Sequence, residues 1–473
     1  MLQLILGRAG SGKTYRIREQ VKQLAEQNTE KVMLLVPEQY SFESEKAMLK
    51  LLGPKQVNKV QVMSFTRLTD MAFRAYGGSG IAKLDDGGRN IFMSLALEEV
   101  KAELEFYVTR VEELIPLMLS VSAELKMCAI APAVLLEMAQ QTEDKKLKQK
   151  LKEVGLILSA YDALVAQSYL DPLDDLQRLK HTFTEHRFFE GYHIYIDSFE
   201  GFTQQEFDLI ELMLSQACEV TVSLSCDTLD NQMGAEVFAR VRHTANVLMR
   251  MARQHHVQVS APIVLEPGIR FATEDLKHLE HQIFRVEKEP LSNVPDVITL
   301  YSGETVYHEA AYIGATIRHL MMNEGYQYQD FAIIARSLDH YRGVLDVALE
   351  QYEVPYFMDT PRSVYAEPLM CLVLYALQIL KSNFSSDDMF VYLKTGLAGL
   401  TPYEISLLEN YTFLWNLSGK KWLKEWTANV DGFVERQTEQ QEKRLEELNQ
   451  LRERAVKPLV RLQKRLKDGD GLI

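Results

Sequence analysis

Residues Gly7 to Thr14 have the sequence GRAGSGKT, which offers the most specific chemistry in the chain. The octapeptide fits the pattern G-x-x-x-x-G-K-T, in which glycines let backbone amides point inward at a phosphate group. The apolar run LQLIL precedes it, and YRIREQVKQLAEQ follows it with helical periodicity. A strand, a glycine-rich loop and a helix N-terminus in this order predict a phosphate-binding P-loop. An ordinary glycine-rich turn is the alternative.

The loop pattern assigns a role to individual side chains. Lys13 would reach the β- and γ-phosphates of a nucleotide, and Thr14 would offer its hydroxyl to Mg²⁺. ATP and Mg²⁺ are therefore the expected cofactors. The residues expected to bind the nucleotide are Gly7, Arg8, Ala9, Gly10, Ser11, Gly12, Lys13 and Thr14.

The segment HIYIDSFEGFTQQE supplies a partner acid for the metal ion. Ile194, Tyr195 and Ile196 predict a buried strand, and Asp197 follows at its end. In this position Asp197 would be the second protein ligand of Mg²⁺ and part of the catalytic site. A turn aspartate that only closes the strand is the alternative.

Hydrolysis requires a further group that orients or deprotonates the attacking water. Many helicase ATPases use an Asp-Glu pair, but here Ser198 follows Asp197, and the nearby acid is Glu200. The sequence therefore predicts nucleotide binding with a degenerate catalytic base. Arg336, at the end of AIIAR, is a second catalytic candidate that would reach a γ-phosphate across a cleft. A surface arginine is the alternative.

Alternating strand and helix patterns must position these residues. Strand patterns occur in LQLIL, VMLLV, VNKVQVMSF, GYHIYIDSF and CEVTVSLSCD, and helical patterns separate them. This order predicts an α/β fold with a parallel, doubly wound sheet. Residues 85–185 show helical periodicity without a strand, which indicates an all-helical insertion. A second strand–helix–strand segment is predicted over 296–383, and residues 384–473 are helical again.

Composition limits the class of protein. Hydrophobic residues make up 47% and charged residues 25% of the 473 residues, which is typical of a globular chain of about three domains. No secretory leader and no membrane-length apolar run is visible, so we expect a cytoplasmic protein without a membrane partner. The cysteines have no paired spacing, so we expect reduced core residues and no zinc or iron–sulfur site. They are Cys128, Cys218, Cys226 and Cys371.

The charge distribution bears on nucleic acid binding. A net charge of −14 argues against a nucleic acid partner. Residues 1–80, however, contain 12 Lys and Arg against 7 Asp and Glu, a net charge of +5. This segment permits a phosphate-facing surface. Solvated helix faces would account for the same numbers.

Five segments together carry a resemblance to a known family: GRAGSGKT, VPEQYSF, VMSFTRL, YIDSFEGFTQQE and FAIIARS. In this order they resemble the B subunit of the bacterial AddAB (RexAB) ATP-dependent helicase–deoxyribonuclease, and the resemblance spans essentially the whole chain. It implies two RecA-like P-loop domains of the superfamily 1 helicase (UvrD) type with helical insertions. Residues 1–84 and 186–295 would form the first RecA-like (1A) domain, and 85–185 its helical 1B insertion. Residues 296–383 would form the second RecA-like (2A) segment, and 384–473 a truncated 2B-like insertion.

The resemblance also implies a function in recombinational repair of double-strand breaks. In that family the A subunit is the motor, and the B subunit is a degenerate helicase that scans single-stranded DNA for the Chi sequence. The implied partners are single-stranded and double-stranded DNA and an A-type helicase–nuclease subunit in a heterodimer. The family's B subunit ends in a nuclease domain with a four-cysteine iron–sulfur cluster. No matching segment occurs here, so we expect this chain to lack nuclease activity and the cluster.

The resemblance assigns DNA contacts to the segments after the second and third strands and beside the extension of Asp197. The DNA-binding candidates are Gln39, Ser41, Phe65, Arg67 and Phe202. The carboxyl ends of parallel strands are where such sheets bind ligands, and aromatic rings stack on bases. Core packing is the alternative for Phe65 and Phe202. Asp70 departs from the expectation, because an acid is a poor neighbour for a DNA strand, and it leaves the recognised sequence open.

Three functions stay in competition. The first is an ATP-binding subunit that scans DNA, and the second is an active, DNA-stimulated helicase or translocase that uses Glu200 or another acid as its base. The third is a structural subunit whose P-loop is a relic. A small-molecule kinase fits the helical insertions and the second α/β segment poorly.

Overall fold

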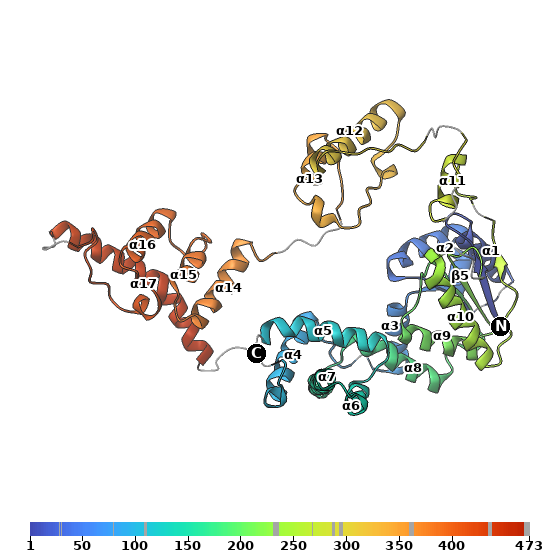
Figure 1. Ribbon diagram of the computed structural model, residues 1–473, viewed down its shortest axis with the longest axis horizontal. Helices are drawn as coiled ribbons and strands as arrows, with labels where there is room; N and C mark the ends of the chain where they lie inside the picture. Colours follow the sequence, from blue (N-terminus) through green and yellow to red (C-terminus); the bar gives the residue numbers. More distant parts are fainter. Residues whose placement is uncertain are drawn as a thin grey trace. The chain divides into compact units, whose positions relative to one another are not determined.

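A computed structural model describes residues 1–27, 29, 31–78, 80–107, 111–229, 236–266, 268–285, 289–292, 297–358, 364–433 and 438–467. The chain divides into two compact units, Met1–Leu300 and Tyr301–Ile473. The first unit contains a parallel sheet with helices around it and a helical insertion, and the second unit is helical in its described elements (Figure 1).

A six-stranded sheet forms the centre of the first unit. Its strands are β1 (Leu2–Leu6), β2 (Val32–Leu35), β3 (Val60–Met63), β4 (His193–Ile196), β5 (Glu219–Leu224) and β6 (Ile263–Val264). They lie in the order β3-β2-β4-β5-β1-β6, and every pair is parallel. Leu6 pairs with Leu224, and Leu35 pairs with Ile196. The loops that follow β1, β2, β3 and β4 therefore leave the same edge of the sheet.

Helices cover both faces of the sheet, because side chains alternate along each strand. Ile5 packs on one face with α1 (Lys13–Glu26) and α2 (Ser41–Gln56). Leu4 packs on the other face, where the helices are α3 (Phe65–Tyr76), α8 (Asp175–His186), α9 (Gln204–Gln216) and α10 (Ala239–Gln254). The short helix α11 (Glu274–Gln282) follows β6. The predicted parallel α/β architecture is confirmed for this unit.

The insertion between β3 and β4 is helical, as its periodicity predicts. Its helices are α4 (Asp86–Val100), α5 (Val111–Met127), α6 (Pro132–Gln141) and α7 (Lys145–Val165), and they share a separate apolar core. A parallel bridge between Lys83 and Leu170 joins the entry of the insertion to its exit. Helix α8 packs instead in the core of the sheet, so packing favours an insertion that ends nearer Leu170 than residue 185.

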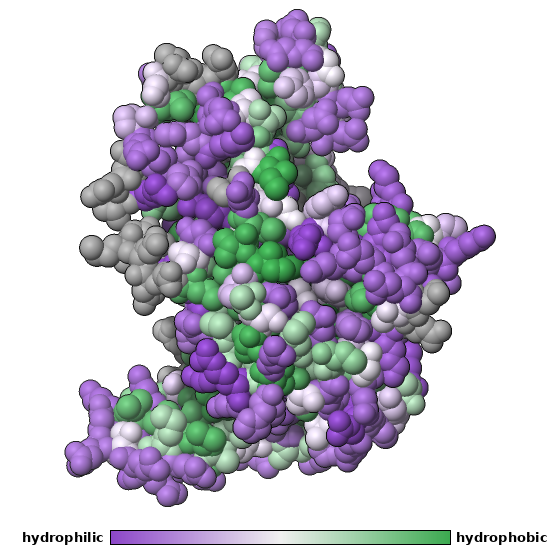
Figure 2. Space-filling view, turned by 90° about the vertical axis from the view of Figure 1, so that its right-hand side faces the viewer, coloured by the Kyte–Doolittle hydropathy of each residue, from purple (hydrophilic) through white to green (hydrophobic). Residues whose placement is uncertain are grey.

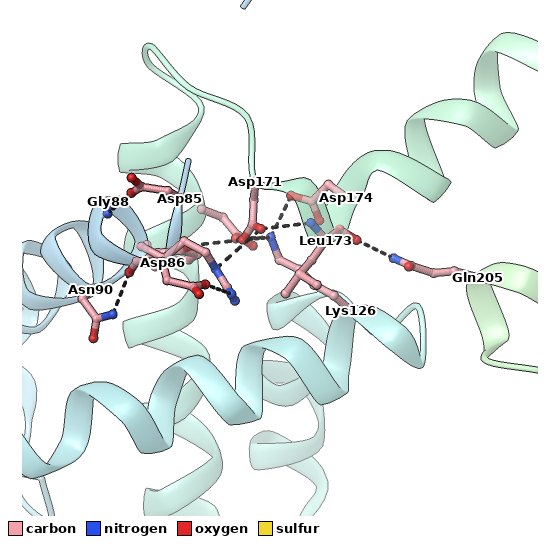
Figure 3. A network of polar contacts seen from close by, with 12 residues as sticks. Asp85, Asp86, Gly88, Asn90, Lys126, Asp171, Leu173, Asp174 and Gln205 are labelled. Carbon is pink, nitrogen blue, oxygen red and sulfur yellow. Dashed lines mark hydrogen bonds and ion pairs between the residues drawn. The ribbon is translucent and has the colours of Figure 1, made fainter. Parts of the chain in front are cut away.

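A partly buried polar network lies at the base of the insertion, around the fully buried carboxylate of Asp171 (Figure 3). The Lys126 ammonium lies 3.0, 2.7 and 3.3 Å from carboxylate oxygens of Asp171, Asp174 and Asp162. Burial alone would lower the pKa of Lys126, but these carboxylates raise it above the usual lysine value. Gln205 Nε2 of α9 donates to the carbonyl of Leu173 at 3.1 Å, so the network also connects to the helix that follows Asp197.

The second unit contains two apolar cores. One core joins α12 (Val306–Glu324) to α13 (Leu345–Gln351). The other surrounds Trp422 and Trp426 and is built by α14 (Pro368–Lys381), α15 (Ser386–Leu393), α16 (Pro402–Leu414) and α17 (Glu439–Lys467). Helices α15, α16 and α17 agree with the helical patterns expected after residue 384, whereas α14 ends before that boundary.

The strands predicted between residues 296 and 383 do not form among the described residues of this range. Residues 297–301, 331–335 and 354–358 carry the apolar runs, but none of them is a strand. Ile334 and Phe357 are 92% and 90% exposed. An apolar run predicts a strand only if other strands lie beside it to accept its hydrogen bonds, and periodicity cannot reveal whether they do. The prediction of strands was therefore wrong for this segment.

Three further features concern the apolar helices, the cysteines and the surface. Among the described residues no single helix is long and apolar enough to cross a membrane. Helices α5 and α6 together have the length and composition of such a span, but a bend of 94° separates them. The four thiols are free, but Cys128 and Cys218 are exposed, so the expectation of core cysteines holds only for the buried Cys226. On the face in Figure 2, hydrophobic groups gather near the middle, between hydrophilic regions.

Candidate nucleotide site and nucleic-acid interface

The P-loop follows β1 and requires glycine at several positions. Gly10 and Gly12 have φ angles of +72° and +89°, in the left-handed region that strains other residues. A Cβ added at Gly7 would lie 2.2 Å from the hydroxyl oxygen of Ser11. The loop therefore has the tight, inward-curled backbone that its sequence predicts, and α1 begins at Lys13 directly after it.

Two polar groups inside the loop are arranged as a phosphate would need them. Lys13 Nζ donates to the carbonyl oxygens of Gly7 and Arg8, at 2.7 and 3.0 Å. Burial lowers the pKa of Lys13, although the nearby Asp197 carboxylate partly opposes this shift. The hydroxyl of Ser11 is buried and has no hydrogen-bond partner among the described residues. An orphaned hydroxyl beside a partly desolvated ammonium fits a phosphate group, which would accept hydrogen bonds from both.

Asp197 is held at the end of β4 by its neighbours. Its amide donates to the carbonyl of Leu35 at 3.0 Å, and its side chain is buried. Its Oδ1 accepts a hydrogen bond from the hydroxyl of Ser223 on β5, the strand that lies between β4 and β1. Thr14 and Asp197 could supply two oxygen ligands to Mg²⁺, which usually completes its shell with phosphates and water. Ser223 was not predicted, although its place near the carboxyl end of the strand in CEVTVSLSC puts it at the same edge of the sheet.

The position expected for a catalytic base is filled by Ser198. This residue is exposed and has a φ of +67°, so the chain turns sharply directly after Asp197. Glu200 is exposed in the following loop. The local structure therefore offers no acid at the residue next to Asp197.

Arg8 is a loop residue whose side chain is already engaged elsewhere. Its Nε lies 2.9 Å from Glu280 Oε1, its Nη2 donates to the Glu280 carbonyl at 2.6 Å, and its Nη1 lies 3.6 Å from Asp227. The guanidinium also lies 5.3 Å from the ring centroid of Phe238. The guanidinium attaches α11 to the loop, so the backbone of Arg8 is the part of this residue that is left to face a nucleotide.

Arg270 is a cation at the mouth of the loop that sequence reasoning missed. Its amide donates to the carbonyl of Gly10 at 3.0 Å, its side chain is exposed, and its charge further lowers the pKa of Lys13. It lies between β6 and α11, at the carboxyl end of a parallel strand. Parallel sheets bind ligands at this end of their strands, which is also why Gln39 was predicted, so the same argument could have identified Arg270. Arg336 is exposed in the second unit, after the segment 331–335 that is not a strand.

The predicted DNA-binding residues differ in their availability. Gln39 is exposed in a 3₁₀ turn (Glu38–Tyr40), whereas Ser41 is buried and its hydroxyl donates to the carbonyl of Glu38 at 2.9 Å. Arg67 is partly exposed but forms an ion pair with Glu45. A DNA phosphate would therefore have to compete with Glu45 for this guanidinium.

The predicted stacking residues are mostly packed. Phe65 is only 8% exposed and meets Phe199 edge to face at 5.8 Å, and Phe202 lies 5.0 Å from the same ring. The packing alternative therefore describes Phe65, because a ring so buried has no face for a base. Phe42 is 69% exposed and Tyr40 is also exposed, in the segment that was already matched to DNA contacts. The buried residues of α2 recur at helical spacing, and Phe42 falls outside that series. This pattern could have identified Phe42 as an exposed aromatic side chain.

Comparison with known proteins decides the family. A family model described as ADDB, N-terminal, matches residues 4–280, which is more than half of the chain. The chain belongs to the AddB family. This confirms the resemblance drawn from the five sequence segments.

Curated relatives agree with the AddB assignment, and each of the following is named as the B subunit of an ATP-dependent helicase/deoxyribonuclease. The chain is 30% identical to the protein of Clostridium kluyveri over 480 residues, which cover 98% of this chain and 42% of that protein. It is 29% identical to the proteins of Clostridium acetobutylicum and Clostridioides difficile, again over 98% of this chain. The chain spans about two fifths of the length of these AddB relatives.

The AddB match begins within β1 and ends within α11. It therefore contains the P-loop, Asp197, Arg270 and the loops after β2 and β3, together with Glu280, which holds Arg8. Arg336 lies outside the matched range.

Proposed function

We propose that this chain is the nucleotide-binding and DNA-contacting part of an AddB-type helicase–nuclease subunit that acts in the repair of double-strand breaks. One observation carries the proposal: a P-loop with a partly desolvated lysine faces a buried strand-end aspartate across the edge of one parallel sheet. The names of the relatives, which include ATP dependence and a deoxyribonuclease, support it.

ATP would lie with its phosphates on the backbone amides of the loop and on the α1 N-terminus. Lys13 would exchange its bonds to the Gly7 and Arg8 carbonyls for phosphate oxygens, Ser11 would donate its hydroxyl, and Arg270 would screen charge at the mouth. Mg²⁺, held by Thr14 and Asp197, would neutralise the β- and γ-phosphates.

We infer that the site binds ATP with weak or no hydrolysis. Phosphoryl transfer to water needs a group that orients the nucleophile, and Ser198 cannot accept its proton as a carboxylate would. ATP would then act as a structural or signalling ligand, and an A-type subunit in a heterodimer would supply the motor.

Single-stranded DNA would cross the loops after β2 and β3. Gln39 and Arg67 would contact phosphates or base edges, and the exposed rings of Tyr40 and Phe42 would stack on bases. Scanning for Chi is the role that this surface would serve in the complex.

The test compares ATP binding with ATP turnover on the purified chain, with and without single-stranded DNA and without the A-type subunit. Lys13→Ala is expected to abolish ATP binding and leave single-strand affinity unchanged, and the exposed Lys101→Ala should change neither. Equal loss of ATP and DNA binding in a folded Lys13 variant would refute separate sites. DNA-stimulated turnover that disappears in Asp197→Ala would establish an active motor and replace this proposal.

A further inference from the structure

A cavity with a strongly cationic lining lies on the second unit, apart from the residues discussed so far. It has a volume of about 890 Å³, and one wall is formed by residues 398–399, between α15 and α16. The other wall is α17, which contributes five cations: Arg454, Lys457, Arg461, Lys464 and Arg465. Pro458 and Leu462 complete the α17 wall, and no acidic or aromatic side chain of the described residues lines the cavity.

The sequence of α17 places these cations on one face. Their spacing of three, seven, ten and eleven residues from Arg454 corresponds to one side of an α-helix. The opposite side, with Ala455, Val456 and Leu459, is buried in the core around the tryptophans. The cations therefore form a stripe beside the cavity, with a length of about 16 Å for eleven residues at 1.5 Å each.

The pairing of these side chains leaves a net positive charge. Arg454 is neutralised, since its Nη1 lies 2.8 Å from Glu404 Oε1 and its Nη2 donates to the Gly399 carbonyl at 2.8 Å. The other four cations form no ion pair with any residue that the structure describes. Four uncompensated charges on one face are notable in a chain with a net charge of −14.

We propose that this cationic groove binds the phosphate backbone of double-stranded DNA. Four cations, Lys457 to Arg465, spread over about 12 Å at 1.5 Å per residue, suit a polyanion with regularly spaced charges better than a single phosphate. A lining without aromatic rings offers no stacking platform, which favours a duplex over a single strand. Contacts to phosphates carry no sequence information, so the binding is independent of sequence. The choice of DNA among polyanions rests on the proposed function.

The experiment uses the full 473-residue chain and a fluorescent 20-base-pair duplex, with affinity measured by anisotropy between 50 and 200 mM salt. The test variant is Lys457→Ala/Arg461→Ala. The matched control is Lys420→Ala/Lys424→Ala, which removes two exposed cations of the same unit that do not line the cavity. Loss of two phosphate contacts should reduce the salt slope by about 1.8 and weaken binding by at least about tenfold at 100 mM salt.

The variants distinguish duplex binding in the groove from a general effect of positive charge and from binding at the nucleotide site. The swap Lys457→Arg/Arg461→Lys should keep the wild-type salt slope, since phosphates respond to charge. Equal weakening in the control double variant, or a groove variant that binds the duplex as the wild type does, would overturn the proposal. Displacement of the duplex by tripolyphosphate at equal phosphate concentration would also overturn it. ATP binding and the Lys13→Ala result should be unaffected in every groove variant, so failure here leaves the proposed function standing.

Discussion

The attachment of α11 to the P-loop by Arg8 gives the sharpest test of how this site is built. Arg8→Met keeps an unbranched apolar stem but removes the guanidinium that contacts Glu280 and Asp227. Glu280 and Asp227 side chains are 16% and 33% exposed, so both carboxylates would lose their partner in a partly desolvated place. Removing one member of a fully buried pair costs about 3–5 kcal/mol. Because water can still reach both carboxylates, we expect the lower end, about 3 kcal/mol.

The assay is amide hydrogen exchange across α11, which reports local opening. A loss of about 3 kcal/mol corresponds to roughly 160-fold faster exchange, at 1.36 kcal/mol for each factor of ten. ATP affinity should fall with it, because the Arg270 amide that donates to Gly10 lies directly before α11. Neutralising the abandoned acid in Arg8→Met/Glu280→Gln should recover part of the loss, with a coupling energy of about 2 kcal/mol.

A control on the same helix makes the result decisive. Lys277 pairs with Glu274 at 2.7 Å, but the side chains are 42% and 82% exposed, so water screens the pair and Lys277→Met should cost below about 1 kcal/mol. If Arg8→Met and Lys277→Met change the exchange of α11 equally, or if the coupling between Arg8 and Glu280 is near zero, the buried pair does not hold α11 and the reasoning fails.

Three further predictions concern the insertion and the residues after β2 and β3 that are proposed to contact DNA. Lys126→Met should destabilise the insertion by about 3 kcal/mol, measured by hydrogen exchange. The exposed Lys101→Met is the control and should cost less than about 1 kcal/mol. The loss of stability in Lys126→Met should become smaller at acidic pH, because the carboxylates left without a partner take up protons. Burial alone would raise the pKa of Glu153, but backbone amides of residues 105–107 lower it, so its stabilisation is fully present above the unfolded pKa and is lost as the pH falls through the lower folded pKa. Glu153→Gln should therefore speed exchange of these amides at pH 7, by about 2 kcal/mol, and the difference from the wild type should shrink as the pH falls through the folded pKa. Phe42→Ala should weaken single-strand binding by about 1–3 kcal/mol in anisotropy without lowering stability, whereas Phe65→Ala should lower stability by about 3–5 kcal/mol.

The part of the fold that the sequence predicts is the part whose signals are local. LQLIL and GRAGSGKT contain the strand, the turn glycines and the helix start within twenty residues, and β1, the loop and α1 form there. Asp197 was placed at a strand end by its three apolar neighbours alone. Strand patterns failed between 296 and 358, because the same apolar runs give no information on whether partner strands lie beside them.

Side-chain partners that are distant in sequence could not be predicted. Arg8 and Glu280 are 272 residues apart, so nothing in GRAGSGKT shows that its second residue is committed to α11. Phe65 and Arg67 follow the same strand and looked equally available. The helix turns Phe65 into the core and leaves Arg67 at the surface beside Glu45, and only the packed structure distinguishes them.

The loop after Asp197 connects the nucleotide site to both other parts of the first unit. Two residues beyond Asp197, the ring of Phe199 packs against Phe65, the first residue of α3, which also carries Arg67. A few residues further, Gln205 is bonded to the insertion through Leu173. The loop between Asp197 and α9 is held at both ends. The ring of Phe199 packs against Phe65 at one end, and Thr203 forms a capping box with α9 at the other. A ligand that binds the Asp197 carboxylate would therefore act on a constrained loop. Under the proposed function, a nucleotide bound beside Asp197 would act through the contact between Phe199 and Phe65 on α3, and so on the position of Arg67, without any bond being broken.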